Sequence, residues 1–161
     1  MTDPEREILT WERFGEVSER LADAIAADDF APDAVLGIAR GGLFLAGALA
    51  YALGVKSVFL MNVEFYTGVD KRLAEPIILP PQLQMGDIAD MNLLIADDVA
   101  DTGATLELVH QLCLSHARQT RTAVLYEKPI STVRADYVGH RTDRWIVFPW
   151  SDARDRAPKT S

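Results

Sequence analysis

Residues 93–105 decide the fold, and they read Leu93-Leu94-Ile95-Ala96-Asp97-Asp98-Val99-Ala100-Asp101-Thr102-Gly103-Ala104-Thr105. The first four are apolar, as expected of a strand buried on both faces of a parallel sheet. Small and hydroxylated residues then open a helix that we expect to extend to about Ala117. Free amides and the helix dipole favour an anion at such an N-terminus, and glycine lets a phosphate approach the backbone. We therefore predict a phosphate site at residues 102–105.

An acidic pair lies directly before this phosphate site. The carboxylates of Asp97 and Asp98 suit sugar hydroxyls or a hydrated Mg²⁺, which takes few carboxylates and several substrate oxygens. A phosphate site next to a hydroxyl or metal site is the combination that a sugar phosphate requires. The alternative that needs no ligand is a polar strand-to-helix turn in which Asp101 or Thr102 caps the helix.

The rest of the chain alternates between helical and strand patterns. We expect helices at residues 11–28, with Thr10 as N-cap, and 43–53, with Gly54 as C-cap. Strands are expected at residues 34–39, 57–63, 93–96 and 121–126. This order predicts an open, mostly parallel α/β sheet in one domain. Such sheets bind ligands beyond the carboxyl ends of their strands, where residues 40–42 and 97–105 both fall.

Residues 64–89 form a connection that is long for a plain loop, although part of it is compatible with a β-ribbon. We expect residues 65–80 to be a lid over the site, with Tyr66 as an aromatic cover and Gly68 as a hinge. Lys71 and Arg72 are then candidate catalytic cations for a negatively charged leaving group. An ordinary twisted hairpin with a solvated tip is the alternative.

Composition excludes several classes of protein. The formal net charge of the 161 residues is −8, which argues against non-specific binding of nucleic acid or an anionic membrane. No apolar run approaches the roughly 20 residues of a membrane span. Residues 1–10 lack the apolar core of a signal peptide, so we expect a cytoplasmic protein. Cys113 is expected to be a buried hydrophobe, and the three histidines show no metal-ligand spacing.

Three segments resemble the type I phosphoribosyltransferases. Residues 93–106 resemble their signature for phosphoribosyl pyrophosphate (PRPP), and residues 37–43 resemble their pyrophosphate loop. Lys128-Pro129 and residues 145–150 resemble the base-binding hood of the bacterial xanthine-guanine enzymes. The resemblance covers roughly residues 33–151. It implies a Rossmann-like sheet flanked by helices, with hood elements near residues 1–30 and 128–151.

The resemblance also implies a role for each residue of the PRPP site. Asp97 and Asp98 would meet the ribose hydroxyls, directly or through Mg²⁺, and Asp101 would lie near the base as its proton acceptor or hydrogen-bond partner. The remaining residues would hold phosphate groups. The pyrophosphate loop, which often contains a non-proline cis peptide in this family, would comprise Arg40, Gly41 and Gly42, and the 5-phosphate would bind to Thr102, Gly103, Ala104 and Thr105.

For the base, the resemblance implies that Lys128 reaches the exocyclic oxygen of an oxopurine. Trp145 would stack on the ring, and the Ile146 backbone would face its edge. The hood departs from the family at Val147, Phe148 and Ser151, where the family has polar or acidic residues, so the base is less constrained than the reaction. Taken alone, Lys128 is compatible with a solvated lysine, and Trp145 and Trp150 with aromatics that cap the core.

The implied activity is Mg²⁺-dependent transfer of the 5-phosphoribosyl group of PRPP to a nucleobase, with release of pyrophosphate. A 6-oxopurine such as xanthine, guanine or hypoxanthine is the expected acceptor. Two alternatives stay open, namely another base and a non-catalytic PRPP sensor of the same fold. The resemblance further implies a homo-oligomer, either a dimer or a tetramer.

Overall fold

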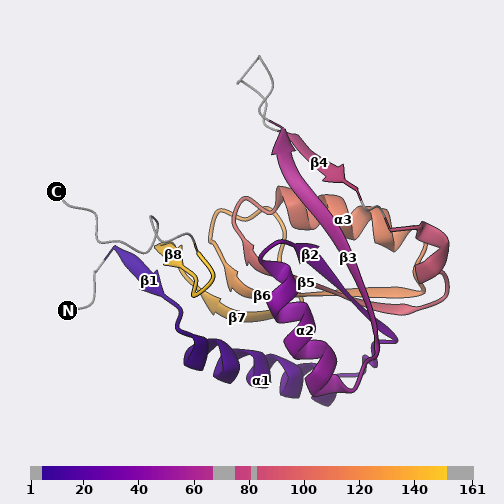
Figure 1. The fold of residues 1–161 in the computed structure, drawn as a ribbon, viewed down its shortest axis with the longest axis horizontal. Coiled ribbons are helices and arrows are strands. Elements are labelled where there is room, and N and C mark those ends of the chain that lie inside the picture. The colour runs from indigo at the N-terminus through magenta and orange to yellow at the C-terminus, as the bar shows by residue number, and fades with distance from the viewer. Residues whose placement is uncertain (1–4, 67–74, 81–82, 152–161) are drawn as a thin grey trace.

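The computed structural model describes residues 5–66, 75–80 and 83–151. Six strands form one sheet in the order β4-β3-β2-β5-β6-β7, in which only the β3–β4 pair is antiparallel (Figure 1). The predicted α/β class with a mostly parallel sheet is therefore confirmed. The strands are β2 (Ala34–Ala39), β3 (Ser57–Tyr66), β4 (Glu75–Leu79), β5 (Asn92–Ala100), β6 (Gln119–Glu127) and β7 (Tyr137–Arg141).

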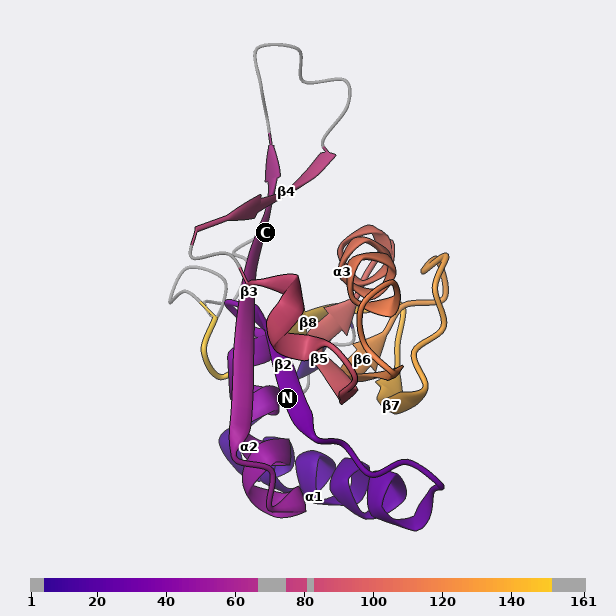
Figure 2. The same cartoon turned by 90° about the vertical axis from the view of Figure 1, so that its right-hand side faces the viewer.

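Helices cover both faces of this sheet. In Figure 2, α3 lies on one side of the central strands and α2 on the other, with α1 next to α2. The Thr10 hydroxyl accepts the Arg13 amide at 3.2 Å, and Gly54 adopts a left-handed φ of 68°, so both predicted caps are confirmed. The elements are α1 (Trp11–Ala27), α2 (Gly42–Leu53), α3 (Ala104–Leu114) and the short 3₁₀ turn η1 (Met85–Ile88).

Alternate residues of the central strands enter two separate cores. Val35 of β2 and Leu94 of β5 pack with the α1 and α2 side chains. Leu36 and Ile95 point the other way and pack with α3. Cys113 of α3 is fully buried in this second core, as predicted, and burial raises the pKa of its thiol to about 11. Because β2 and β5 are buried on both faces, the position of their carboxyl ends is fixed.

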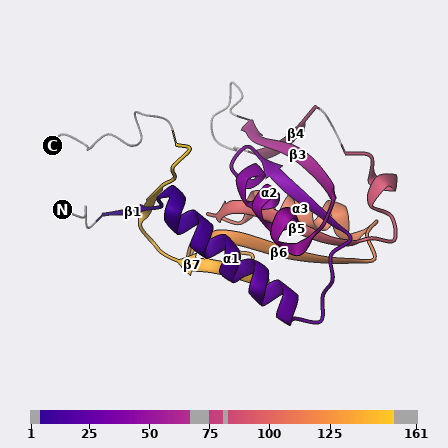
Figure 3. The ribbon, with the colours of Figure 1, turned by 60° about the horizontal axis from the view of Figure 1, so that its bottom comes forward.

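A second, two-stranded sheet joins the two ends of the described chain. The strands β1 (Arg6–Ile8) and β8 (Trp145–Val147) are parallel, with Glu7 opposite Ile146. Helix α1 follows β1, and Figure 3 shows it lying across β6 and β7, on one face of the main sheet. The two segments that we assigned to the hood are thus in contact with each other. No helix of the described residues is long and apolar enough to cross a bilayer.

Three predicted boundaries were wrong by three residues or more. Strand β5 continues to Ala100, so the acidic pair lies within the strand rather than after it. The reason is its neighbour β6, which continues the pairing at Asp97↔Val124 and Val99↔Tyr126. Strand β3 extends past Val63 to pair with β4, so part of the expected long connection is a β-ribbon. Helix α3 ends at Leu114, three residues before Ala117.

A buried carboxylate fixes the loop that follows β6. Glu127 is fully buried and accepts the Ala135 amide at 2.8 Å. Its other oxygen accepts hydrogen bonds from Arg134 and Arg141, both at 3.1 Å. Burial alone would raise the pKa of Glu127, but the Ala135 amide and the two arginines outweigh it and lower the pKa. The chain from β6 to β7, including Lys128, is anchored by this group.

Replacing Glu127 by Gln should lower the free energy of unfolding by about 2 kcal/mol at pH 7, because hydrogen bonds to a charged group are lost. A lowered pKa in the folded state means that this stabilisation is present above the unfolded pKa of about 4.3 and is lost as the pH falls through the folded pKa. Urea unfolding at pH 7 and pH 4 should show the difference from wild type shrinking at the lower pH. Glu19→Gln, on the exposed side of α1, is the control. An equal difference at both pH values would contradict this account.

Candidate active site

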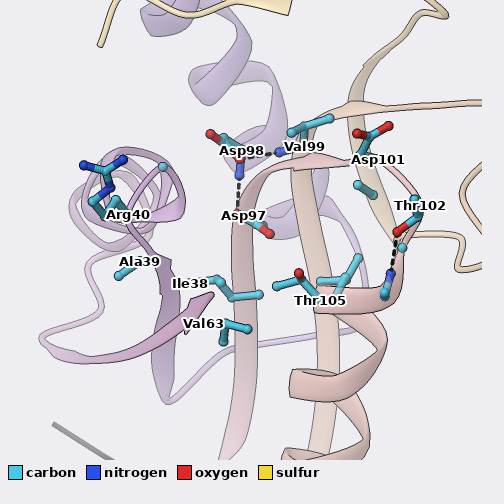
Figure 4. Close-up of a pocket in the computed structure, with 15 residues that line it drawn as sticks. Ile38, Ala39, Arg40, Val63, Asp97, Asp98, Val99, Asp101, Thr102 and Thr105 are labelled. Atoms are coloured by element: carbon cyan, nitrogen blue, oxygen red, sulfur yellow. Dashed lines mark hydrogen bonds between the residues drawn. The ribbon is translucent and has the colours of Figure 1, made fainter. Parts of the chain in front are cut away.

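The carboxyl ends of β2 and β5 open onto a cavity of about 520 Å³. The two strands are parallel neighbours, with Gly37 opposite Ala96, so their following loops leave the sheet at the same edge. Figure 4 shows Arg40 on one side of this cavity and Asp101 and Thr102 on the other, with the acidic pair between them. The two segments that the sequence singled out therefore form one site.

The acidic pair lies at the bottom of the site and is largely buried. Asp97 is 8% exposed, and its Oδ1 accepts the Asp98 amide at 2.8 Å. Oδ1 of Asp98 in turn accepts the Val99 amide at 2.8 Å. Burial and then repulsion by Asp98 raise the pKa of Asp97 well above its ordinary value. Burial also raises the pKa of Asp98, although hydrogen bonds from Val99, Asp97 and Trp150 oppose it.

These carboxylates fit a magnesium ion that brings most of its ligands with the substrate. Asp97 and Asp98 offer only oxygen donors, which Mg²⁺ prefers, and a cation would relieve their mutual repulsion. Within the described ranges, no group of three or more His, Cys, Asp or Glu side chains could hold a metal. The pair therefore resembles a docking point for a metal–substrate complex more than a resident metal centre.

The loop after β2 approaches the acidic pair through two glycines. The peptide bond between Ala39 and Arg40 is cis, as the resemblance led us to expect. A side chain at Gly42 would come within 2.6 Å of the Ala96 carbonyl oxygen, and one at Gly41 would overlap the Asp98 carboxylate. Gly42 is therefore required for this loop to pack on the backbone of β5, whereas Gly41 leaves space for the Asp98 carboxylate. Arg40 stays exposed at the cavity.

The loop before α3 forms the other wall. Gly103 has a φ of 90°, and α3 begins at the next residue with the Ala104 amide donating to the Thr102 hydroxyl at 3.3 Å. A side chain at Gly103 would lie 2.7 Å from the Ser131 hydroxyl. The Thr132 amide donates to the Thr102 carbonyl at 2.9 Å. Ser131 and Thr132 thus support the predicted phosphate loop. Sequence analysis missed this role, because two adjacent hydroxyl residues are the only local feature that could have indicated it.

The structure brings together nearly all of the predicted PRPP residues. Gly42 does not line the cavity but packs beneath it, against Ala96 and Asp97. Lys71 and Arg72, and most of the predicted lid, lie outside the described residues, so their role stays a prediction. The predicted residues that line the cavity are Arg40, Gly41, Asp97, Asp98, Asp101, Thr102, Gly103, Ala104 and Thr105.

The three predicted base-binding residues do not line this cavity. The Lys128 ammonium donates to the Arg144 carbonyl, although its own amide donates to Ala100 at the end of β5. The Trp145 side chain is 60% exposed, whereas Ile146 is buried in the β1–β8 ribbon. The hood is therefore attached to the site by its backbone, and its predicted base contacts stay a prediction.

A helix N-terminus, an acidic pair and a glycine loop around one cavity are the features expected of a protein that binds a sugar phosphate. Residues 5–155 match the phosphoribosyl transferase domain family. The chain is 33% identical over 150 residues to the xanthine-guanine phosphoribosyltransferase of Cereibacter sphaeroides (strain ATCC 17025 / ATH 2.4.3), covering 90% of this chain and 86% of that protein. The same enzyme of Ruegeria sp. (strain TM1040) is 32% identical over 155 residues, covering 90% and 85%.

Among solved structures, the purine phosphoribosyltransferase of Pyrococcus horikoshii Ot3 superposes with a TM-score of 0.83 and 38% sequence identity. The alignment covers 92% of this chain and 95% of that one. The protein therefore belongs to the phosphoribosyltransferase family, and the resemblance drawn from three short segments is confirmed.

Replacing Gly41 by Ala should impair PRPP binding without destabilising the fold. Gly41 has a helical φ of −59°, so alanine is not strained there, but its methyl group must displace the Asp98 carboxylate. We expect the KM for PRPP to rise roughly tenfold to hundredfold, the scale of a small misplacement in a site. The midpoint of thermal unfolding should stay within a few degrees of wild type. Gly47→Ala in α2 is the matched control, since an added Cβ there meets nothing within 4 Å. An unchanged KM at Gly41→Ala would sink the assignment.

Proposed function

We propose that this phosphoribosyltransferase transfers the 5-phosphoribosyl group of PRPP to a 6-oxopurine and releases pyrophosphate, with Mg²⁺ bound together with PRPP, and so returns a free base to the nucleotide pool. The observation that carries the proposal is the single cavity in which the acidic pair, the Gly41 loop and the start of α3 meet. Each of these three elements matches one part of PRPP, namely the ribose, the pyrophosphate and the 5-phosphate. The names of the curated relatives support the oxopurine acceptor.

The start of α3 is the proposed seat of the 5-phosphate. The backbone amides at the start of α3 and the helix dipole favour the anion, and the Ala104 amide already donates to an oxygen, the Thr102 hydroxyl. Asp97 and Asp98 would then face the ribose hydroxyls and the metal. When bound, Mg²⁺ supplies positive charge to the departing pyrophosphate in a protein whose own net charge is −8.

In the reaction, the bond between the anomeric carbon and pyrophosphate breaks, and a ring nitrogen of the base forms the new bond from the opposite face. Negative charge gathers on the pyrophosphate as it leaves. The backbone amides of the Arg40-Gly41 loop would stabilise that charge, and the exposed Arg40 side chain would add positive charge. The loops also hold the reactants together and exclude water, which would otherwise hydrolyse PRPP.

Asp101 is the proposed proton acceptor for the base. It lines the cavity, is exposed, and lies between the acidic pair and the phosphate loop. Lys128, Trp145 and the Ile146 backbone are the proposed base contacts. Lys128 already donates to one carbonyl oxygen, that of Arg144, so binding an oxopurine oxygen would exchange one acceptor for another of the same kind. Trp145 has an exposed ring face available for stacking.

The proposed function is tested by incubating the protein with Mg²⁺, PRPP and a panel of free bases, and measuring pyrophosphate release. Xanthine, guanine or hypoxanthine should support turnover, and adenine and uracil should not. Asp101→Asn should reduce turnover by about 10²-fold, the usual scale for losing a proton acceptor, with PRPP binding retained. PRPP binding without pyrophosphate release from any base would instead identify a sensor, and activity confined to adenine or a pyrimidine would refute the oxopurine assignment.

We also propose that the chain forms a homo-oligomer through the outer side of α2 and the neighbouring strand edge. Tyr51 is 93% exposed, and Leu43 on the same helix is also exposed. Val58 and Leu60 of β3 and Ile77 of β4 add further exposed apolar side chains. An apolar patch of this kind is typical of a protein–protein contact. Sedimentation velocity should show a dimer or tetramer that Tyr51→Glu dissociates, with Glu16→Gln on exposed α1 as control. A wild-type protein that stays monomeric at all concentrations tested would exclude the proposed homo-oligomer.

A further inference from the structure

The hood loop, from Lys128 to Thr132, holds the backbone on both sides of Asp101. At its start, the Lys128 amide donates to the Ala100 carbonyl at 2.9 Å. At its end, the Thr132 amide and hydroxyl both donate to the Thr102 carbonyl, at 2.9 Å and 3.2 Å. Figure 4 shows Asp101 and Thr102 at the turn between β5 and α3. This turn is therefore held by a segment that lies far from it in sequence.

The hood loop is itself a fixed support. The Ser131 amide donates to the Lys128 carbonyl at 3.1 Å, and the Ser131 hydroxyl donates to the Val133 carbonyl at 2.7 Å. Both bonds close the loop into a compact turn. On either side of that turn, the buried Glu127 carboxylate accepts the Ala135 amide at 2.8 Å. Because its two ends are held, the hood loop can impose its geometry on the residues that it contacts.

Two donors on the Thr102 carbonyl also fix the direction of the next amide. Among the described residues only the Ala39–Arg40 peptide bond is cis, so the Thr102–Gly103 bond is trans. The C=O and N–H groups of a planar trans peptide point in opposite directions. Thr132 does not line the main cavity, whereas Thr102 and Gly103 do. The Gly103 N–H is thus directed away from Thr132 and toward the cavity.

The Gly103 amide is available for a ligand. Within the part of the chain that the structure describes, it donates to no acceptor. The Gly103 carbonyl, in contrast, accepts the Glu107 amide at 2.9 Å and so begins the hydrogen bonding of α3. A donor at the N-terminus of a helix acts together with the helix dipole on an anion. The direction in which this amide points therefore matters for phosphate binding.

We propose that Thr132 is a positioning residue for the 5-phosphate of PRPP: its two hydrogen bonds to the Thr102 carbonyl orient the Gly103 N–H toward the cavity, where this amide binds the phosphate. The inference rests on the proposed function and deepens it. One short loop then serves both substrates, with Lys128 at its base end and Thr132 at its phosphate end. A threonine that only closed a turn would affect stability, and would not distinguish one phosphate group of the substrate from another.

Thr132→Val tests this distinction, because it removes the hydroxyl donor and keeps the shape and the backbone amide. Ribose 5-phosphate is the probe, since it carries the 5-phosphate without the pyrophosphate. Its Kd should rise about threefold to tenfold, the effect of losing one neutral hydrogen bond. The Kd for pyrophosphate with Mg²⁺ should stay within twofold of wild type, because that anion is assigned to the Gly41 loop.

Two further variants control this measurement. Thr132→Ser keeps the hydroxyl and should bind ribose 5-phosphate within twofold of wild type. Thr142→Val is the matched control, since the Thr142 hydroxyl also bonds to the backbone, accepting the Arg144 amide at 3.1 Å, but Thr142 does not line the main cavity. It should bind both probes like wild type. In turnover, Thr132→Val should raise the KM for PRPP and leave the KM for the base within twofold.

The Gly103 amide gives a readout that does not depend on activity. In ¹H–¹⁵N spectra of the wild-type protein, its resonance should shift when ribose 5-phosphate is added and should not shift with pyrophosphate. In Thr132→Val, the same shift should require a higher concentration of ribose 5-phosphate. A Gly103 resonance that ignores ribose 5-phosphate would show that this amide does not bind the phosphate.

Other results would also overturn the proposal. If Thr132→Val lowers the midpoint of thermal unfolding but binds ribose 5-phosphate like wild type, Thr132 only closes the turn. If the variant weakens ribose 5-phosphate and pyrophosphate equally, its effect on the site is general. Failure of the proposed function has a different signature, because the wild-type protein would then release no pyrophosphate from PRPP with any base, whatever the ribose 5-phosphate titration shows.

Discussion

The structure depends on two neighbouring carboxylates held at the end of a strand that is buried on both faces. Asp97 and Asp98 repel each other and are largely withdrawn from water, which raises the pKa of both. Such a pair is costly to maintain unless amides, donors or a cation compensate it. Amides of the strand itself supply part of that compensation, at 2.8 Å for each residue. A substrate that brings a metal ion would supply the rest, so the cost of holding the two carboxylates together favours binding of such a substrate.

The loop after β2 and the turn into α3 both approach the Asp97–Asp98 pair closely. The loop after β2 can pack on the end of β5 because Gly42 has no side chain to meet the strand backbone, and Gly41 leaves space for the Asp98 carboxylate. The turn into α3 requires the positive φ of Gly103 and is braced by Ser131 and Thr132. That brace belongs to a loop which the buried Glu127 anchors to β6. The phosphate side and the base side of the site are thus mechanically linked through backbone contacts, and a change in the hood would be felt at the phosphate loop.

Much of this arrangement could be predicted from local sequence, and the exceptions share a cause. Apolar runs predicted the central strands. Residues 97–105 predicted the site, because most of the polar residues that line it are adjacent in sequence. The end of β5 was misplaced because pairing with β6 continues through two acidic residues, and a neighbouring strand is invisible to a local pattern. The partners of Glu127 and the brace of Ser131 on Gly103 were missed for the same reason. The aromatic residues near position 150 were noted, but their stacking on Phe44 of α2 was not, since it joins residues more than a hundred positions apart.

The contrast between the two halves of the site follows from these physical demands. Binding a polyanion with a chain of net charge −8 requires fixed dipoles and a compensated acidic pair, so the PRPP half is built from strand ends, glycines and a helix start that have few alternatives. A planar base needs only a ring face, a donor for its oxygen and some backbone, which a peripheral ribbon such as β1–β8 can present. Lys128 and Trp145 accordingly lie on exposed or partly exposed surfaces away from the main cavity. The residues proposed for the reaction therefore lie in the rigid part of the fold, while the proposed base contacts lie on a peripheral segment that is coupled to it through backbone contacts.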